Sequence, residues 1–289
     1  MPPRSLCSLP PEGEGLPWDG PAGGLRASSR VSLMASRAQP LRRDDQPAYV
    51  LHAYAYRETS LIVEAFAAEY GRVAMVARGA KRPRSEMRGL LQGFQPLLLS
   101  WAGQQELKTL VKVEWRGGLP LVGGAALLCG FYLNELLLKL LPREDSHPRL
   151  FASYESALAD LAAGVEQAPV LRRFELTLLT ELGYALPLVR EADTGGPIDP
   201  SARYHYAFDR GPRLAPPAPG VRLPQVRGAT LLALADGRYV DAETAAEAKR
   251  LMRDVLDHYL EQRGVESRRV VQDLQALDSK REEENDRRD

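Results

Sequence analysis

The apolar residues of this chain change their spacing once, near residue 120, and this change limits the folds that the chain can adopt. Between about residues 47 and 116 they stand in short runs separated by turn residues, which is typical of β-strands. From Ala125 onward they recur every three or four residues, as on one face of an amphipathic helix. A block of strands followed by a block of helices predicts an α+β protein with more than one domain.

The strand block favours a small closed barrel. Its five apolar runs cover residues 49–56, 60–66, 73–77, 94–101 and 107–115. Tight polar turns join the first three runs and the last two, and a longer connection follows the third. This arrangement, in about 70 residues, suits a five-stranded barrel of the OB type. We interpret His52, in the first run, as a barrel residue with satisfied polar groups rather than a metal ligand.

The helical block predicts an all-α domain with one irregular insertion. Helices are expected at 125–141, 150–163, 169–182, 225–235, 244–262 and 267–277. Thr244 and Glu247 have the spacing of a capping box that opens the fifth helix. Residues 190–222 are rich in Pro, Gly and charge, and we expect them to form an irregular excursion.

We therefore divide the chain into a barrel domain at 46–118 and a helical domain at 119–278. Residues 1–45 lack apolar periodicity and read as a disordered extension, or as a misassigned start with Met34 as the true initiator. Residues 279–289 read as a charged, disordered tail.

Charge and cysteine content favour a cytoplasmic protein with a local basic surface. The 38 basic residues balance the 38 acidic ones, but residues 46–116 hold ten Lys and Arg against six Glu, a net of +4. The two cysteines, Cys7 and Cys129, cannot form a disulfide framework or a thiolate metal site. The longest apolar stretch, 125–141, is interrupted by polar residues and is too short to span a membrane.

A candidate nucleic-acid contact follows the third strand. The loop carries five cations with only Glu86 opposing them: Arg78, Lys81, Arg82, Arg84 and Arg88. Such a run repels itself unless an anion lies between its members, and a phosphate backbone is the commonest such partner. The alternative is a solvated basic loop without a partner. Tyr54 and Tyr56 could stack on bases or pack in the core.

No pattern of catalytic or cofactor-binding residues is present. The loop has Arg82 where a phosphate-binding P-loop needs Ser or Thr, and the four His residues are scattered. Asp193, Asp199 and Asp209 lack the regular spacing of a calcium site. We therefore predict no catalytic residue, no metal and no cofactor.

Two adjacent arginines, Arg172 and Arg173, allow two interpretations. Arg173 could pair with Glu175 or Glu181 at the surface. Arg172, beside an apolar helix face, could instead bind a carboxylate while neighbouring Leu and Phe side chains form a pocket.

Several short motifs together resemble the RecO family of bacterial recombination mediators. They run in family order over about residues 46–278. In the barrel block they are Tyr49-Val-Leu-His, Arg57-Glu-Thr-Ser-Leu, Glu69-Tyr-Gly-Arg-Val and Ala77-Arg-Gly-Ala-Lys. In the helical block they are Phe131-Tyr-Leu-Asn-Glu-Leu, Leu171-Arg-Arg-Phe-Glu-Leu, Leu182-Gly-Tyr, Tyr259-Leu and Glu266-Ser-Arg.

The resemblance implies a non-enzymatic role in DNA repair through the RecF pathway. RecO proteins bind single- and double-stranded DNA and anneal complementary strands. With RecR they help RecA to load on single strands coated by single-strand-binding protein (SSB). The five loop cations fall in the family's basic DNA-binding stretch, and Arg172 falls where the family meets the acidic, apolar-ended SSB tail. The resemblance also implies a nucleoid-associated protein.

One departure from the family concerns zinc. Many members carry four cysteines in the excursion, whereas residues 190–213 contain none, so zinc is not expected. Two other functions stay open on the residues alone. They are an OB-fold protein that binds ribosomal or messenger RNA, and a metal-dependent phosphoryl enzyme that uses Asp193 or Asp199.

Overall fold

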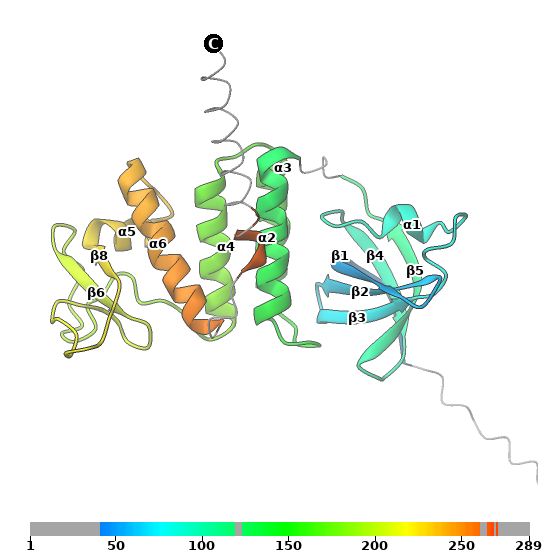
Figure 1. Ribbon diagram of the computed structural model, residues 1–289, viewed down its shortest axis with the longest axis horizontal. Helices are drawn as coiled ribbons and strands as arrows, with labels where there is room; N and C mark the ends of the chain where they lie inside the picture. Colours follow the sequence, from blue (N-terminus) through cyan, green and yellow to red (C-terminus); the bar gives the residue numbers. More distant parts are fainter. Residues whose placement is uncertain (1–40, 119–122, 261–264, 269, 271–289) are drawn as a thin grey trace, which may run out of the picture. The chain divides into compact units, whose positions relative to one another are not determined.

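The computed structural model describes residues 41–118, 123–260, 265–268 and 270 (Figure 1). Its first part is a closed five-stranded barrel with the strand order β1-β2-β3-β5-β4. The strands are β1 (Arg42–Tyr56), β2 (Ser60–Ala67), β3 (Gly71–Ala77), β4 (Leu97–Ala102) and β5 (Leu107–Trp115). Only the β3–β5 pair is parallel among these five. The predicted barrel is confirmed.

Small and branched side chains on alternate strand positions fill the barrel. Val63, Ala65 and Ala67 of β2 face inward, opposite Val73 and Met75 of β3, and all are buried. At the β2–β3 turn the chain has no room for a side chain. Gly71 has a φ of +64°, and a Cβ there would lie 1.7 Å from the carbonyl oxygen of Asp145.

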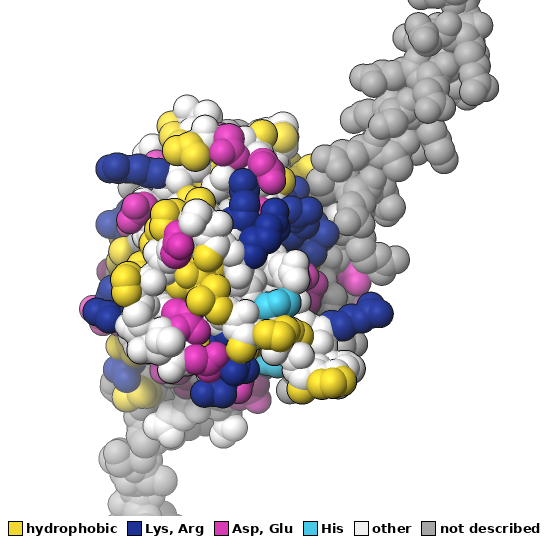
Figure 2. All heavy atoms as spheres, turned by 90° about the vertical axis from the view of Figure 1, so that its left-hand side faces the viewer, with side chains coloured by type: hydrophobic (Ala, Val, Ile, Leu, Met, Phe, Trp, Pro, Cys, Tyr) yellow, Lys and Arg dark blue, Asp and Glu magenta, His cyan; other side chains and the backbone are white. Residues whose placement is uncertain are grey.

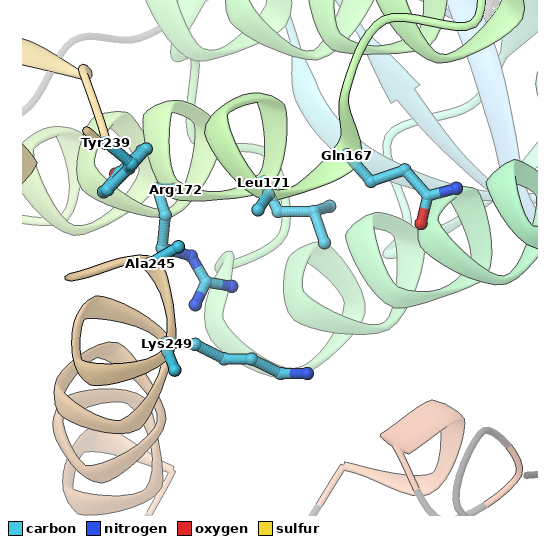
Figure 3. A pocket seen from close by; sticks show the side chains of 8 residues that line it. Gln167, Leu171, Arg172, Tyr239, Ala245 and Lys249 are labelled. Carbon is cyan, nitrogen blue, oxygen red and sulfur yellow. The ribbon is translucent and has the colours of Figure 1, made fainter. Parts of the chain in front are cut away.

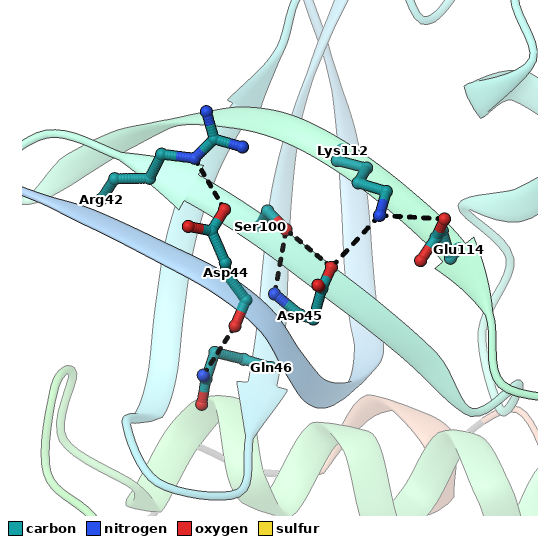
Figure 4. A network of polar contacts seen from close by, with 7 residues as sticks. All are labelled: Arg42, Asp44, Asp45, Gln46, Ser100, Lys112 and Glu114. Atoms are coloured by element: carbon teal, nitrogen blue, oxygen red, sulfur yellow. Dashed lines mark hydrogen bonds and ion pairs between the residues drawn. The ribbon is translucent and has the colours of Figure 1, made fainter.

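The first strand begins earlier than predicted. Residues 42–45, which we assigned to the extension, belong to β1, and a bulge between Arg43 and Gln46 shifts its register against β4. At the bulge Asp45 has a φ of 49°, and its backbone N–H donates to the Ser100 hydroxyl at 2.9 Å. Figure 4 shows how the Asp45 carboxylate also accepts from Ser100 and pairs with Lys112 at 3.4 Å. These polar contacts extend the strand beyond its apolar run.

The helical part contains α2 (Gly124–Leu140), α3 (Pro148–Ala162), α4 (Gln167–Glu181), α5 (Gly228–Asp236) and α6 (Ala242–Tyr259). Their buried residues form one apolar cluster, which also includes Tyr49 and Phe66 of the barrel. A polar contact joins the two parts, because the Asn134 side-chain amide of α2 donates to the Leu51 carbonyl at 2.9 Å. The predicted barrel followed by a helical domain is therefore the observed fold class.

The starts of α5 and α6 differ from the prediction for identifiable reasons. Residues 225–227 form strand β8 (Gln225–Arg227), so α5 begins later, at Gly228. The predicted capping box of α6 is wrong, because Asp241 caps this helix and accepts from the Thr244 N–H at 2.6 Å. Glu247 instead accepts hydrogen bonds from Arg227 and Thr230.

The excursion is more regular than predicted. β6 (Arg203–Ala207) pairs with β7 (Gly211–Arg213) on one side and with β8 on the other, which gives a three-stranded antiparallel sheet. Tyr204 and Tyr206 of β6 are buried in the helical core. The loop before the sheet is held by Arg213, which donates to both carboxylate oxygens of Asp193. No group of three or more potential metal ligands occurs within the described ranges.

Several sequence predictions lie outside the described residues. They are the expectations for residues 1–40 and for the tail at 279–289, as well as most of the helix at 267–277. Within the described part of the chain, no helix has the length and apolar character needed to cross a membrane.

Candidate nucleic-acid interface and partner pocket

The basic loop after β3 has an ordered backbone and exposed cationic side chains. The Lys81 N–H donates to the Thr59 carbonyl of the β1–β2 turn at 2.9 Å, and the Arg82 N–H donates to the Gly79 carbonyl at 3.0 Å. Ala80, the residue before Lys81, is fully buried and anchors the loop in the barrel core. The short helix α1 (Met87–Leu90) then ends the loop.

The five predicted contact residues share this loop and point to solvent. All are exposed, and within the described ranges none has an ion-pair partner: Arg78, Lys81, Arg82, Arg84 and Arg88. A row of unneutralised guanidinium and ammonium groups creates a positive potential that attracts a polyanion. The backbone turns fix where these charges lie, which lowers the ordering cost of binding.

An aromatic strip adjoins the loop on the outer face of β1. His52, Tyr54 and Tyr56 alternate along the strand, and the His52 and Tyr54 rings lie 4.3 Å apart between centroids. Tyr54 is 48% exposed. Tyr56 is half-buried and lies under the guanidinium of Arg57, 5.1 Å from its ring centroid. His52 lies on a barrel strand, as expected, and its side chain is exposed, with its ring tilted by 58° against the Tyr54 ring.

The basic loop and the aromatic strip are close because both are attached to the turn between β1 and β2. Thr59, whose carbonyl accepts from Lys81, lies in the turn that connects Tyr56 to Ser60. Proteins bind single-stranded nucleic acid with two such elements. Exposed aromatic rings stack on the bases, and a row of cations contacts the phosphates.

Arg172 lies inside the protein rather than on the surface of α4. It is 8% exposed, and its Nη2 donates to Oε1 of Glu175 at 2.5 Å. Glu175 has no exposed surface. Arg173 is exposed and pairs with Asp160 of α3, so the expectation that Arg173 would pair with Glu175 or Glu181 is wrong.

Two further side chains complete a buried polar chain around Glu175. The Tyr132 hydroxyl donates to its Oε1 at 2.6 Å, and Arg268 in turn donates to the Tyr132 hydroxyl at 3.1 Å. Burial raises the pKa of Glu175 above its usual range, while the charge of Arg172 and the Tyr132 hydrogen bond act in the opposite direction. The chain ties α2, α4 and the segment after α6 together.

Arg172 also forms part of the wall of a pocket between α4 and α6. The pocket has a volume of about 250 Å³. Its lining is mainly apolar and consists of Gln167, Ala168, Leu171, Arg172, Tyr239, Ala245, Ala246 and Lys249. Figure 3 shows that Arg172 and Lys249 extend from the two helices toward the same space. The volume lies below the ~300–1,000 Å³ of typical small-molecule sites and suits one or two peptide side chains.

Two polar atoms of the pocket residues have no hydrogen-bond partner among the described residues. They are Nε of Arg172 and the hydroxyl of Tyr239, and both are buried. Burial also raises the pKa of the Tyr239 hydroxyl to about 12, so it stays a donor at neutral pH. Tyr239 and Lys249 are not among the predicted site residues, because nothing in their local sequence patterns links them to α4.

The side of the protein formed by α5, α6 and the small sheet carries many charges. Figure 2 shows Lys and Arg side chains gathered in one patch there, with Asp and Glu side chains beside it. The exposed cations of this region are Arg203, Arg210, Arg222, Arg238, Lys249 and Arg250. Lys249 belongs both to this set and to the pocket lining.

Both parts of the chain match protein-family models. Residues 43–118 match the model described as "Recombination protein O N terminal", and residues 123–269 match "Recombination protein O C terminal". A DNA repair protein RecO of Aromatoleum aromaticum is 53% identical over 241 residues, which is 83% of this chain and all of that protein. The RecO of an Azoarcus species is 51% identical over 82% of this chain and 98% of its own length.

A further relative extends the match. The RecO of Ralstonia nicotianae is 46% identical over 264 residues, which is 91% of this chain and 96% of that protein. The two family models together cover most of the chain and fall on the barrel and on the helical part. The chain therefore belongs to the RecO family of DNA repair proteins.

Proposed function

We propose that this protein binds single- and double-stranded DNA through its barrel and anneals complementary strands. It would reach SSB-coated single strands by docking the acidic SSB tail in the pocket between α4 and α6. The family to which the chain belongs gives it a role in DNA repair and recombination. The annealing step, the SSB contact and the division of labour between residues 46–118 and 119–278 are the proposal.

The observation that carries the DNA-binding half is the position of the five loop cations beside the aromatic strip. The cations have no acidic partner among the described residues, and the exposed ring of Tyr54 lies on the strand next to their loop. Phosphates would bind the guanidinium and ammonium groups while bases stack on the rings. Neutralising phosphates on two strands lowers their mutual repulsion, and base pairing then supplies the free energy of annealing.

The proposed docking of the SSB tail is supported by the pocket that Arg172 helps to form. An acidic peptide with an apolar end needs a small apolar cavity with cations beside it, and this pocket offers Leu171 and alanine side chains next to Arg172 and Lys249. RecR as co-mediator and RecA as the recombinase that is loaded are also part of the proposal. Their support is the family alone, and we assign no surface to either. We assign no catalytic residue, and the protein would act in the cytoplasm on chromosomal DNA.

The proposal is tested by annealing of bare complementary DNA strands, followed by the loss of a fluorescence signal from the free strands. The unchanged protein should accelerate annealing, and a variant with Lys81, Arg82 and Arg84 changed to Ala should do so less. A control with Arg149, Arg210 and Arg222 changed to Ala removes the same charge from exposed sites on the helical part. Equal activity of the two triple variants would contradict the role of the loop. Equal annealing of RNA would favour RNA binding instead.

A further inference from the structure

The outer face of the barrel beside the aromatic strip carries a row of charged side chains that ends in the helical part. His52 of β1 lies opposite Glu64 of β2, so their side chains are on the same face of the sheet. Arg143, in the connection between α2 and α3, donates to the Glu64 carboxylate. The row therefore begins at the exposed rings of His52 and Tyr54 and ends at Arg143.

The backbone holds Arg143 at the edge of the sheet. Arg143 forms a parallel bridge with Arg72 of β3, and the N–H of Glu144 donates to the Arg72 carbonyl at 2.9 Å. Ala74 lies opposite Glu64 on β3, and its side chain is one methyl group. The Arg143 guanidinium can therefore cross β3 and reach the Glu64 carboxylate. Backbone and side-chain contacts together fix where the guanidinium lies.

The two carboxylates that contact Arg143 differ in exposure. The Glu64 side chain is 5% exposed and accepts from Nη2, whereas the side chain of Glu106, just before β5, is 71% exposed and accepts from Nη1. Loss of the Glu64 contact would leave a buried charge without compensation. Loss of the Glu106 contact would cost little, because an exposed ion pair contributes little to stability. Nη1 is therefore the donor of Arg143 that another anion can reach.

We propose that Nη1 of Arg143 binds a phosphate of single-stranded nucleic acid whose bases stack on the aromatic strip, and that Glu106 competes for this phosphate site in the free protein. The proposal rests on the proposed function and adds a contact outside the basic loop. A guanidinium binds phosphate oxygens by directed, charge-assisted hydrogen bonds. The rings of His52 and Tyr54, at the other end of the row, offer stacking surfaces to the neighbouring bases.

Glu106 makes this site selective for a strand that is held at several points. Because Glu106 belongs to the same chain, its carboxylate is present at a high effective concentration and excludes weakly bound anions. A strand already bound to the basic loop and the aromatic strip brings its own phosphate to Arg143 and displaces Glu106. Displacement adds one phosphate contact, and the strand releases the counterions that this phosphate held.

The test compares two carboxylate-to-amide variants of the full-length protein. Binding of a labelled thymidine oligonucleotide is followed by fluorescence anisotropy at several salt concentrations. Glu106→Gln removes the competing charge and keeps the size of the side chain. Glu69→Gln is the matched control, because Glu69 is exposed in the β2–β3 turn of the same barrel and has no ion-pair partner among the described residues.

Glu106→Gln should raise the affinity for the strand at low salt by about two- to fivefold, the scale of one exposed ion pair. It should also steepen the slope of log K against log salt concentration by about 0.7, the contribution of one phosphate contact on a single strand. Glu69→Gln should raise the affinity by less than about twofold and leave the slope unchanged, because salt screens a charge that does not contact the strand.

A second set of variants determines whether the gain depends on Arg143. Arg143→Gln alone would leave the buried Glu64 carboxylate without its cation, so it is combined with Glu64→Gln, and urea unfolding checks that the double variant is folded. In that background Glu106→Gln should have no more effect than Glu69→Gln, because it frees no guanidinium. If the double variant does not fold, the salt slopes of Glu106→Gln and Glu69→Gln decide alone.

Two results would overturn the inference and leave the proposed function intact. One is an equal effect of Glu106→Gln and Glu69→Gln on affinity and on the salt slope. The other is the full gain from Glu106→Gln in the protein that lacks Arg143. Failure of the unchanged protein to bind the strand would overturn the proposed function, and this inference with it.

Discussion

Arg172 and Glu175, one turn apart on α4, form a buried ion pair with 2.5 Å between Nη2 and Oε1. The arginine that the sequence suggests as a carboxylate receptor beside an apolar helix face is thus already bonded to a carboxylate within the protein. Removing one partner of a buried pair leaves the other charge without compensation, which typically costs about 3–5 kcal/mol of stability. An Arg172→Ala variant would therefore lose peptide binding and stability together, and it cannot separate the two roles.

A double-mutant cycle isolates the contribution of this ion pair to stability. Arg172→Met should destabilise the protein strongly, because the Glu175 carboxylate stays buried without its guanidinium. Adding Glu175→Gln should recover much of the loss, since the amide oxygen can still accept from Tyr132. Urea unfolding of the two single variants and the double variant should give a coupling energy of about 0.5–3 kcal/mol. Purely additive free energies of unfolding would argue against the buried pair.

The loop cations should be visible in the salt dependence of DNA affinity. Each phosphate contact on a single strand contributes about 0.7 to the slope of log K against log salt concentration. Changing Lys81, Arg82 and Arg84 to Ala should therefore lower that slope by up to about 2, measured by anisotropy at several salt concentrations. An unchanged slope would remove the loop from the contact surface.

Tyr54 should contribute to single-strand binding in a way that salt does not affect. Its ring is exposed beside His52, and stacking of one base on such a ring is worth about 1–3 kcal/mol. Tyr54→Ala should weaken binding of single strands by that amount without changing the salt slope, whereas Tyr54→Phe keeps the ring and should bind normally. If Phe and Ala weaken binding equally, the ring does not stack on a base.

From the contacts of Glu135 in α2 we expect that acid lowers the stability of the fold. Its carboxylate accepts from the backbone N–H groups of Glu266 and Ser267, at 2.7 and 2.8 Å, and pairs with Lys139 at 2.8 Å. Burial alone would raise the pKa of this group, but the hydrogen bonds from Lys139, Ser267 and Glu266 outweigh it and lower the pKa.

A lowered pKa in the folded state stabilises the fold above the unfolded-state pKa, which is about 4.3, and this contribution is lost as the pH falls through the folded-state pKa. Unfolding by urea should therefore show that Glu135→Gln is less stable than the unchanged protein at pH 7. The difference should shrink on acidification below the unfolded-state pKa. A difference that does not depend on pH would mean that the carboxylate charge plays no part.

The periodicity of apolar residues predicted the barrel and most of the helices, because one buried face fixes both the element and its ends. It placed α2, α3 and α4 close to their observed bounds. It missed the start of β1, where Asp45, Ser100 and Lys112 hold the strand by polar contacts. It also missed β6, whose pairing with β7 and β8 is set by segments on either side of a Pro-rich loop.

Of the two candidate sites, one can be recognised in the sequence and the other depends on the fold. The loop cations all lie between residues 78 and 88, so their clustering is visible before the fold is known. The pocket cannot be recognised in the sequence, because Leu171 and Arg172 of α4 meet Tyr239 and Lys249 only after α6 packs on α4. Burial of Arg172 and its pairing with Glu175 likewise depend on Tyr132 and Arg268 from other elements.

The central claim, that one protein handles DNA and docks SSB, is tested most directly by annealing of complementary strands that are already coated with SSB. The assay compares intact SSB with a form that lacks its acidic tail. The account predicts acceleration by this protein with intact SSB and much less with the tail-less form. No acceleration with either form would contradict it.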